Sequence, residues 1–153
     1  KGKPGIRSTG AATEEQVARA THAVANEHQV QFLHCVTAYP CPPEDISVRL
    51  GLRKSLDWRA PVGLSDHTLD PVVAPVMAVA LGASVIEKHL TLDRSLPGPD
   101  HSYAIEPKEF AEMVRCVQLA ERMLGDGVKR IQPSEEQYRE WQHRDGGLRG
   151  QMA

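Results

Sequence analysis

The sequence predicts an α/β protein in which parallel strands alternate with helices. Strand-like and helical segments follow one another four times along the 153 residues, an order typical of parallel sheets with helical crossovers. Three of the four strand-like segments begin apolar and end polar, as expected where chemistry sits at the carboxyl ends of strands. Hydrophobic residues make up 41% of the chain and charged residues 25%, which is ordinary for a globular domain. Both a barrel and a doubly wound sheet fit this pattern.

The first two strand–helix units each carry a boundary signal. A short strand is predicted at residues 5–9, and the helix after it opens with Thr13 and Gln16. This pair forms a capping box, in which the two side chains satisfy free backbone N–H groups. The second strand is predicted at 30–37, where a run of prolines closes it. A less regular helical stretch is expected from 47 to 58.

Proline and aspartate mark the third and fourth units. The third strand is predicted at 62–66. Asp70 followed by Pro71 is typical of a helix start, with aspartate as the cap and proline in the first turn. That helix is small and apolar and ends near Gly82, and the fourth strand is predicted at 84–89.

The most regular helix is predicted from Pro107 to Gly125. Glycine at the end of a helix is a common terminator. Apolar residues recur along this segment at helical spacing, namely Phe110, Met113, Val114, Val117, Ala120 and Leu124. The chain beyond is polar and rich in glycine, so we expect one barrel-type domain over 1–132 and a loosely ordered tail over 133–153.

Charge and cysteine content exclude several classes of protein. The formal net charge is −2 and no basic stripe is visible, so a nucleic-acid partner is not expected. No apolar run approaches the roughly 20 residues of a membrane span, so a membrane partner is not expected either. The unpaired spacing of Cys35, Cys41 and Cys116 favours a reducing compartment, the cytoplasm. No glycine-rich nucleotide motif is present.

Two histidines occupy equivalent positions at the ends of the third and fourth predicted strands. Because strand side chains alternate between faces, Ser65 shares a face with His67, and Glu87 shares a face with His89. Neighbouring strands would bring His67 and His89 together, and two imidazoles with open positions can bind a divalent metal. Glu87 could orient a ligand, relay a proton or join the metal. Alternatively, each histidine only caps its strand by bonding to backbone.

Hydroxyl groups stand at the carboxyl ends of three predicted strands. Ser8, Thr37 and Ser65 are suited to holding phosphate, although ordinary loop hydrogen bonds would also explain them. Tyr39, two residues after Thr37, either faces the same cavity or packs. The proline-rich loop after the fourth strand carries Asp100, which can accept hydrogen bonds from sugar hydroxyls or lie in a solvated turn.

The chain resembles the N-acetylneuraminate (sialic acid) synthase family over about residues 1–132. The opening of the chain fits this family, and several long motifs occur in the family's order. These motifs are Leu33–Pro40, Gly63–Thr68, Ala80–His89 and Pro97–His101.

This resemblance implies half of a (β/α)8 TIM barrel, strands five to eight. It implies a transferase that condenses phosphoenolpyruvate with N-acetylmannosamine, or a related N-acylated amino sugar, into a nine-carbon 2-keto acid and phosphate. It also implies a divalent metal, Mn²⁺ or Mg²⁺, acting as a Lewis acid on the sugar aldehyde, and a homo-oligomer in the full-length family. The residues that match are His67 and His89 for the metal, Glu87 with these two for catalysis, Ser8, Thr37 and Ser65 for the phosphate, and Tyr39 and Asp100 for the sugar.

Some features depart from the family. Thr37 stands where Asn or Ser is usual, and Arg7 puts a charge where an apolar side chain would pack. The family's N-terminal half barrel and antifreeze-like domain are not recognisable, so we expect an incomplete and inactive fragment. Two other hypotheses stay open. One is a different metal-dependent barrel enzyme, an aldolase or isomerase with a third metal ligand, and the other is a non-catalytic remnant.

Overall fold

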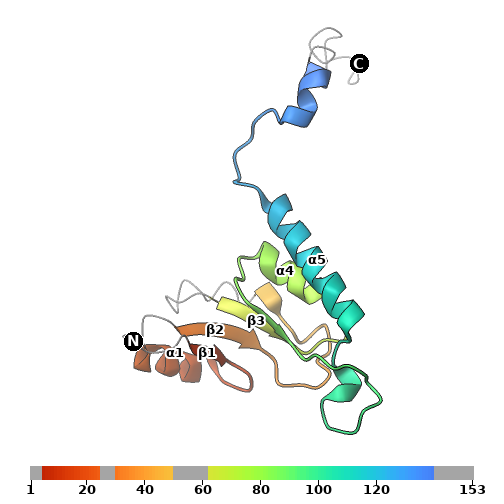
Figure 1. The fold of residues 1–153 in the computed structure, drawn as a ribbon. Coiled ribbons are helices and arrows are strands. Elements are labelled where there is room, and N and C mark those ends of the chain that lie inside the picture. The colour runs from red at the N-terminus through yellow and green to blue at the C-terminus, as the bar shows by residue number, and fades with distance from the viewer. Residues whose placement is uncertain (1–4, 25–29, 50–61, 140–153) are drawn as a thin grey trace, which may run out of the picture.

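A four-stranded parallel sheet forms the centre of the computed structural model, which describes residues 5–24, 30–49 and 62–139 (Figure 1). The sheet has the order β1-β2-β3-β4. Because each crossover moves the chain one strand along without a reversal, the described residues form half of a β/α barrel rather than a doubly wound sheet. The predicted strands are confirmed within two residues at each end. The strands are β1 (Gly5–Ser8), β2 (Val30–Cys35), β3 (Val62–Asp66) and β4 (Ile86–Lys88).

Side-chain hydrogen bonds support the starts of the first two described helices. Thr13 and Gln16 form the predicted capping box: the Thr13 N–H donates to Gln16 Oε1 at 2.8 Å, and the Gln16 N–H donates to Thr13 Oγ1 at 3.3 Å. Asp70 accepts hydrogen bonds from the N–H groups of Val72 and Val73, so it supports the start of the next helix, although the N-cap position is Val72 rather than the predicted Asp70. The helices are α1 (Glu14–Ala23), α4 (Val73–Ala80) and α5 (Pro107–Leu124), with the 3-10 turns η1 (His101–Tyr103) and η2 (Pro133–Glu135).

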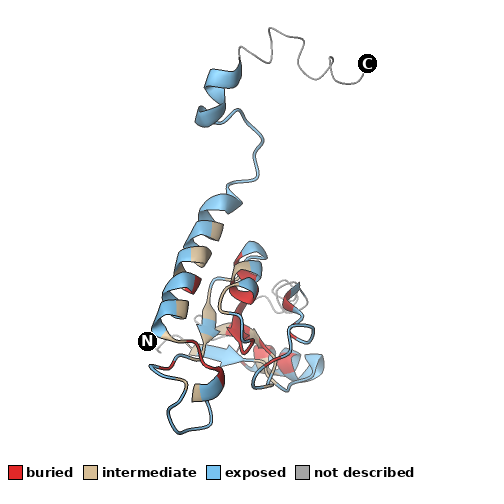
Figure 2. Ribbon diagram, turned by 90° about the vertical axis from the view of Figure 1, so that its right-hand side faces the viewer, coloured by how far each residue is buried: buried red, intermediate tan, exposed pale blue. Residues whose placement is uncertain are grey.

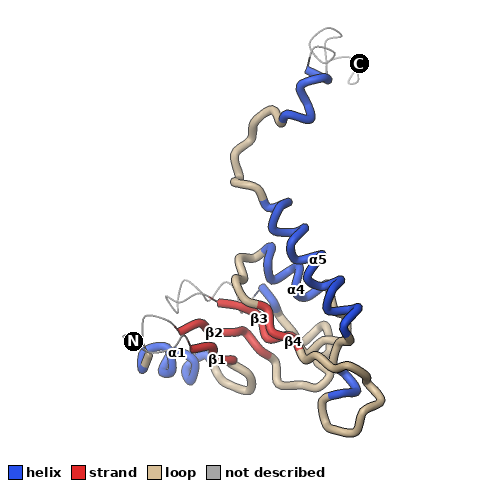
Figure 3. Tube along the Cα trace, in the orientation of Figure 1, coloured by secondary structure: helices blue, strands red, loops and turns tan. Residues whose placement is uncertain are grey.

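The long helix α5 has the predicted ends, with Pro107 in its first turn and Gly125 after its last residue. Its apolar face is only partly covered, and most of the helix is coloured as exposed or intermediate in Figure 2. Met113 is buried, whereas Phe110 and Leu124 are exposed. The chain then leaves the sheet and reaches η2 (Figure 3). The helical stretch predicted from 47 to 58 lies largely outside the described residues. Within the described ranges, no helix combines the length and apolarity needed to cross a membrane.

The two faces of the sheet differ in chemistry. On the face toward α4, Val62 and Leu64 of β3 pack against Ala74 and Ala78 of the helix. Residues that follow β2 complete this core, namely Cys41, Ile46 and Val48. Because side chains alternate along a strand, Gly63 and Ser65 of β3 lie on the opposite face. The carboxyl edge of that face is therefore the place where a polar site can form.

Candidate functional site

The carboxyl ends of β3 and β4 bring the predicted histidines together. The two strands pair in register, with Ser65 opposite Glu87, and the Ser65 hydroxyl donates to Glu87 Oε1 at 2.7 Å. His67 and His89 follow two residues after Ser65 and Glu87, just beyond the strand ends, and their ring centroids lie 5.1 Å apart. All four side chains thus lie at one end of the sheet, as their alternation along the strands predicts.

Backbone groups hold His67 in a single orientation. Its side chain is buried, and Nδ1 lies 2.8 Å from the carbonyl oxygen of Val36. The backbone carbonyl of His67 accepts from the N–H of Cys41 at 2.8 Å. Because a carbonyl can only accept, Nδ1 carries a proton, and in the neutral imidazole the lone pair is then on Nε2. This is the tautomer and the type of support that metal-binding histidines have in proteins.

Two tyrosines complete a group of four rings around this edge. The Tyr39 ring centroid is 4.4 Å from that of His67 and 5.9 Å from that of His89. Tyr103 lies 5.5 Å from Tyr39 and 5.3 Å from His89, with its ring edge-on to the imidazole. Tyr39 is half exposed, so it forms a wall of the site that a ligand can reach.

Asp100 approaches the same group from the loop after β4. Its Oδ2 lies 4.0 Å from Nε2 of His89, and its Oδ1 accepts a hydrogen bond from the hydroxyl of Tyr103. Burial and this hydrogen bond raise the pKa of Tyr103 to about 12, so the hydroxyl remains a donor at neutral pH. Sequence reasoning missed Tyr103. The available signal was its position three residues after Asp100, where one 3-10 turn stacks side chains.

A parallel bridge holds the loop that carries Asp100. The N–H of Ile105 donates to the carbonyl of His89 at 2.9 Å, and the N–H of Thr91 donates to the carbonyl of Ile105 at 2.9 Å. The Thr91 hydroxyl also lies 2.7 Å from Nδ1 of His101. These bonds close the loop directly beside His89 and so fix where Asp100 can lie.

The predicted phosphate-binding hydroxyls lie at or just after the carboxyl ends of three adjacent strands. Ser65 is buried and tied to Glu87. Thr37 is exposed after β2 and lies so near Gly10 that a Cβ there would be 2.1 Å from its hydroxyl oxygen. Ser8 is exposed at the end of β1. Phosphate binding by these hydroxyls stays a prediction.

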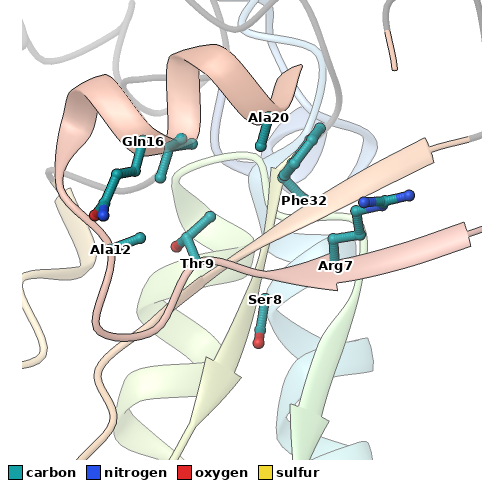
Figure 4. A pocket seen from close by; sticks show the side chains of 8 residues that line it. Arg7, Ser8, Thr9, Ala12, Gln16, Ala20 and Phe32 are labelled. Carbon is teal, nitrogen blue, oxygen red and sulfur yellow. The ribbon is translucent and has the colours of Figure 1, made fainter. Parts of the chain in front are cut away.

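A cavity of about 400 Å³ opens between α1 and the first two strands, apart from the histidine pair (Figure 4). Arg7, Gln16 and Phe32 are among the residues that line it. Arg7 is exposed here, so its charge is not buried against a core as the sequence comparison with the family suggested. Ser8 also borders this space, but Figure 4 shows its side chain directed away from α1.

The donor groups present fit a divalent ion that keeps several coordination positions for water or substrate. Across the described part of the chain, no group of three or more His, Cys, Asp or Glu is arranged to hold a metal ion. The third ligand that a rival metal-dependent barrel enzyme would need is therefore not found there. Two imidazoles, one with its tautomer set by backbone, remain suitable ligands for Mn²⁺.

The open half barrel and its polar carboxyl edge define this chain as a member of the β/α-barrel class, with its candidate site where barrel enzymes carry theirs. The chain belongs to the NeuB family, whose model matches residues 1–129. This confirms the sialic acid synthase resemblance that the motifs indicated.

Three relatives illustrate the similarity. The chain is 43% identical to pseudaminic acid synthase of Campylobacter jejuni over 127 residues, which cover 82% of this chain and 37% of the relative. It is 39% identical to human N-acetylneuraminate-9-phosphate synthase over 137 residues, 88% of this chain and 38% of the relative. The crystal structure of N-acetylneuraminic acid synthetase from Leptospira borgpetersenii superposes with a TM-score of 0.78 at 32% identity, covering 92% of this chain and 50% of that one. The chain spans about two fifths of the curated relatives' length.

Proposed function

We propose that this chain is half of the catalytic barrel of an enzyme that condenses phosphoenolpyruvate with an N-acylated amino sugar. The observation that carries the proposal is the pair formed by His67 and His89, whose ring centroids are 5.1 Å apart, with Tyr39 and Asp100 beside it. The names of the relatives, pseudaminic acid synthase and N-acetylneuraminate-9-phosphate synthase, support a nine-carbon 2-keto acid as the product class. N-acetylmannosamine and related amino sugars are the candidate acceptors.

The proposed reaction joins three carbons to six. Carbon 3 of phosphoenolpyruvate attacks the open-chain aldehyde of the sugar, water adds at carbon 2, and phosphate leaves from the resulting tetrahedral carbon. His67 and His89 would hold a divalent ion, Mn²⁺ or Mg²⁺, which when bound supplies Lewis-acid polarisation of the aldehyde. The hydrogen bond from His67 Nδ1 to Val36 keeps Nε2 available for this task.

The remaining side chains have roles that follow from their contacts. Glu87, held by the Ser65 hydroxyl at 2.7 Å, can take the proton that the attacking water loses. Asp100 can accept from a sugar hydroxyl, because Tyr103 occupies only one of its carboxylate oxygens. Tyr39 offers a half-exposed ring face and hydroxyl to the sugar.

We further propose that the isolated chain is inactive. Phosphoenolpyruvate is a multiply charged anion that must be held at its carboxylate and its phosphate with the reacting atoms aligned. At the candidate site, Ser8, Thr37 and Ser65 offer neutral hydroxyls, whereas charge-assisted hydrogen bonds are about twice as strong. Lys88 lies on the other face of the sheet, where it pairs with Asp66.

A cytoplasmic location is part of the same proposal, supported by Cys35, Cys41 and Cys116, all of which are free thiols.

Metal titration tests the site without requiring turnover. Mn²⁺ binding to the purified chain is measured by the electron paramagnetic resonance signal of the free ion. We expect His67→Ala and His89→Ala to weaken binding at least about tenfold, since even supporting residues of metal sites contribute that much. His22→Ala, at an exposed position of α1, should bind as the wild type does. Equal binding by all four proteins would remove the histidine pair from the proposal.

A second assay tests the reaction. Phosphate release from phosphoenolpyruvate is followed with N-acetylmannosamine and Mn²⁺, for the chain alone and for the chain mixed with the N-terminal barrel half of a relative. We expect sugar-dependent release only in the mixture. Release by the chain alone, lost in His89→Ala, would contradict the proposed incompleteness but support the proposed chemistry.

A further inference from the structure

A buried ion pair lies on the other face of the sheet from the two histidines. Lys88 Nζ is 2.7 Å from Asp66 Oδ2, and the two side chains are 2% and 0% exposed. Lys88 Nζ also donates to the carbonyl of Thr68 at 2.6 Å, and Asp66 Oδ1 accepts from the N–H of Thr68 at 2.8 Å. Both carboxylate oxygens and two ammonium protons are therefore engaged away from solvent.

The ion pair joins the last residues of β3 and β4, directly before the two histidines. Asp66 and Lys88 are register partners in β3 and β4, and each immediately precedes a histidine in the chain. Because side chains alternate, the ion pair and the imidazoles lie on opposite faces of the same two strand ends. Any sliding of one strand end past the other, which would move His67 relative to His89, must also stretch this ion pair.

Stability alone gives a weak reason for such a pair. Taking two charges out of water costs several kcal/mol per ion, and apolar replacements of buried pairs are often neutral or stabilising. Fixing the pairing register of β4 against β3 is a better reason here. β4 has only three residues, each with one register partner in β3, and a one-residue slip would exchange the faces of every side chain. Such a slip would turn Lys88 toward the site and Glu87 away from it.

We infer that the Asp66–Lys88 ion pair is a positioning device that sets the separation of the His67 and His89 imidazoles from the opposite face of the sheet. This rests on the proposed function in one respect, that the two histidines bind a divalent ion. The effect should be greater at His89 than at His67. The imidazole of His67 has its own hydrogen bond to Val36, whereas His89 is held through its backbone, by the short β4 and by the bond from the Ile105 N–H.

The test replaces both charges at once. The double variant Asp66→Asn/Lys88→Met leaves no unpaired charge in the interior, which favours folding. Met113→Ala truncates a buried side chain of α5 and serves as the control for lost stability, since it leaves the strand ends untouched. Each protein is assayed for unfolding by urea, for Mn²⁺ affinity while folded, and for amide hydrogen exchange of β3 and β4.

A positioning role predicts that the folded double variant binds Mn²⁺ at least about tenfold more weakly, in the range that supporting residues of metal sites show. It also predicts that β4 amides exchange faster in this variant, while Met113→Ala keeps wild-type affinity. Wild-type Mn²⁺ affinity and wild-type β4 protection in the double variant would overturn the inference.

Two further outcomes separate this inference from the proposed function. If the wild type binds no Mn²⁺ but the double variant loses β4 protection, the proposed metal site fails and the control of register stands. If the double variant does not fold, Asp66→Glu keeps both charges and lengthens one side chain by a methylene. We then expect its Mn²⁺ affinity to fall several-fold, and wild-type affinity in this variant would overturn the inference.

Discussion

The two imidazoles of the candidate site differ in how firmly the protein holds them. His67 is buried, with Nδ1 bonded to Val36 and its carbonyl bonded to Cys41. The side chain of His89 is 34% exposed, and its nearest charged neighbour is Asp100 at 4.0 Å. In the proposed metal site, the imidazole of His67 would therefore be fixed before a metal arrives, whereas that of His89 would depend on the strand end that carries it.

The hydroxyl of Tyr103 provides a residue-scale prediction with a defined pH dependence. Its pKa is about 12 in the folded chain against an ordinary value of 10.0, so between these pH values the unfolded chain loses a proton that the folded chain keeps. Stability from this group is present below pH 10 and falls as the pH rises toward 12. We expect the advantage of the wild type over Tyr103→Phe in urea unfolding to shrink across this range. Parallel pH profiles for the two proteins would contradict it.

Gly63 is a second residue whose identity the packing requires. A Cβ at this position would lie 2.4 Å from the carbonyl oxygen of Val85 and 2.6 Å from Leu33 Cδ2. Since the first contact is to backbone, relief requires moving β3 away from β4. We expect Gly63→Ala to lower the free energy of unfolding by about 1–3 kcal/mol, measured by urea denaturation. Gly5→Ala, where the nearest atom would be 3.8 Å away, is the matched control and should change stability little.

At the scale of elements, the ends of helices were easier to predict from the sequence than contacts between residues on different strands. The capping box at Thr13 and the proline and glycine at the ends of α5 act within a few residues, so the sequence shows them directly. The histidine pair was predictable because alternation along two parallel strands is a simple geometric rule. The Asp66–Lys88 pair was not, since its partners lie 22 residues apart and meet only if the register is known. The alternation rule placed Lys88 on the other face but named no partner.

The start of α5 is an element whose stability should depend on one carboxylate. Glu109 accepts from the Glu106 N–H at 2.8 Å and pairs with Arg94 at 2.5 Å. The Arg94 hydrogen bond, followed by that of Glu106, lowers the pKa of Glu109. Its stabilising effect is therefore complete above the ordinary value of 4.5 and is lost as the pH falls through the lowered pKa.

We expect Glu109→Gln to cost about 1 kcal/mol at pH 7, the usual size of a helix-cap contribution. The difference from the wild type should disappear in acid. Thermal unfolding followed by circular dichroism at several pH values measures this. Glu121→Gln, exposed on the same helix, is the control. A cost that is the same at all pH values would show that Glu109 acts through packing rather than charge.

At the scale of the whole molecule, the described sheet is an open structure. β1 and β4 each pair with one neighbour within the described residues, so both outer edges present unpaired backbone groups. A complete β/α barrel has no such edge. The relatives are more than twice as long as the matched region. The motifs predicted this half barrel, but the amount of apolar surface left open depends on side-chain packing and could not be predicted.

Open edges and exposed apolar side chains predict that the 153-residue chain associates with itself. Ile6 on β1 is 56% exposed, and Leu90 and Leu92 just after β4 are 54% and 81% exposed. Burying apolar surface contributes roughly 25 cal/mol per Å², and each new strand pair also satisfies backbone hydrogen bonds. We expect sedimentation velocity to detect a shift from monomer to larger species as the concentration rises.

Ile6→Lys, which places a charge on the β1 edge, should weaken association because edge lysines oppose strand pairing. His22→Lys adds the same charge on exposed α1 and should not. A single monomeric species at all concentrations would show that these edges are already protected.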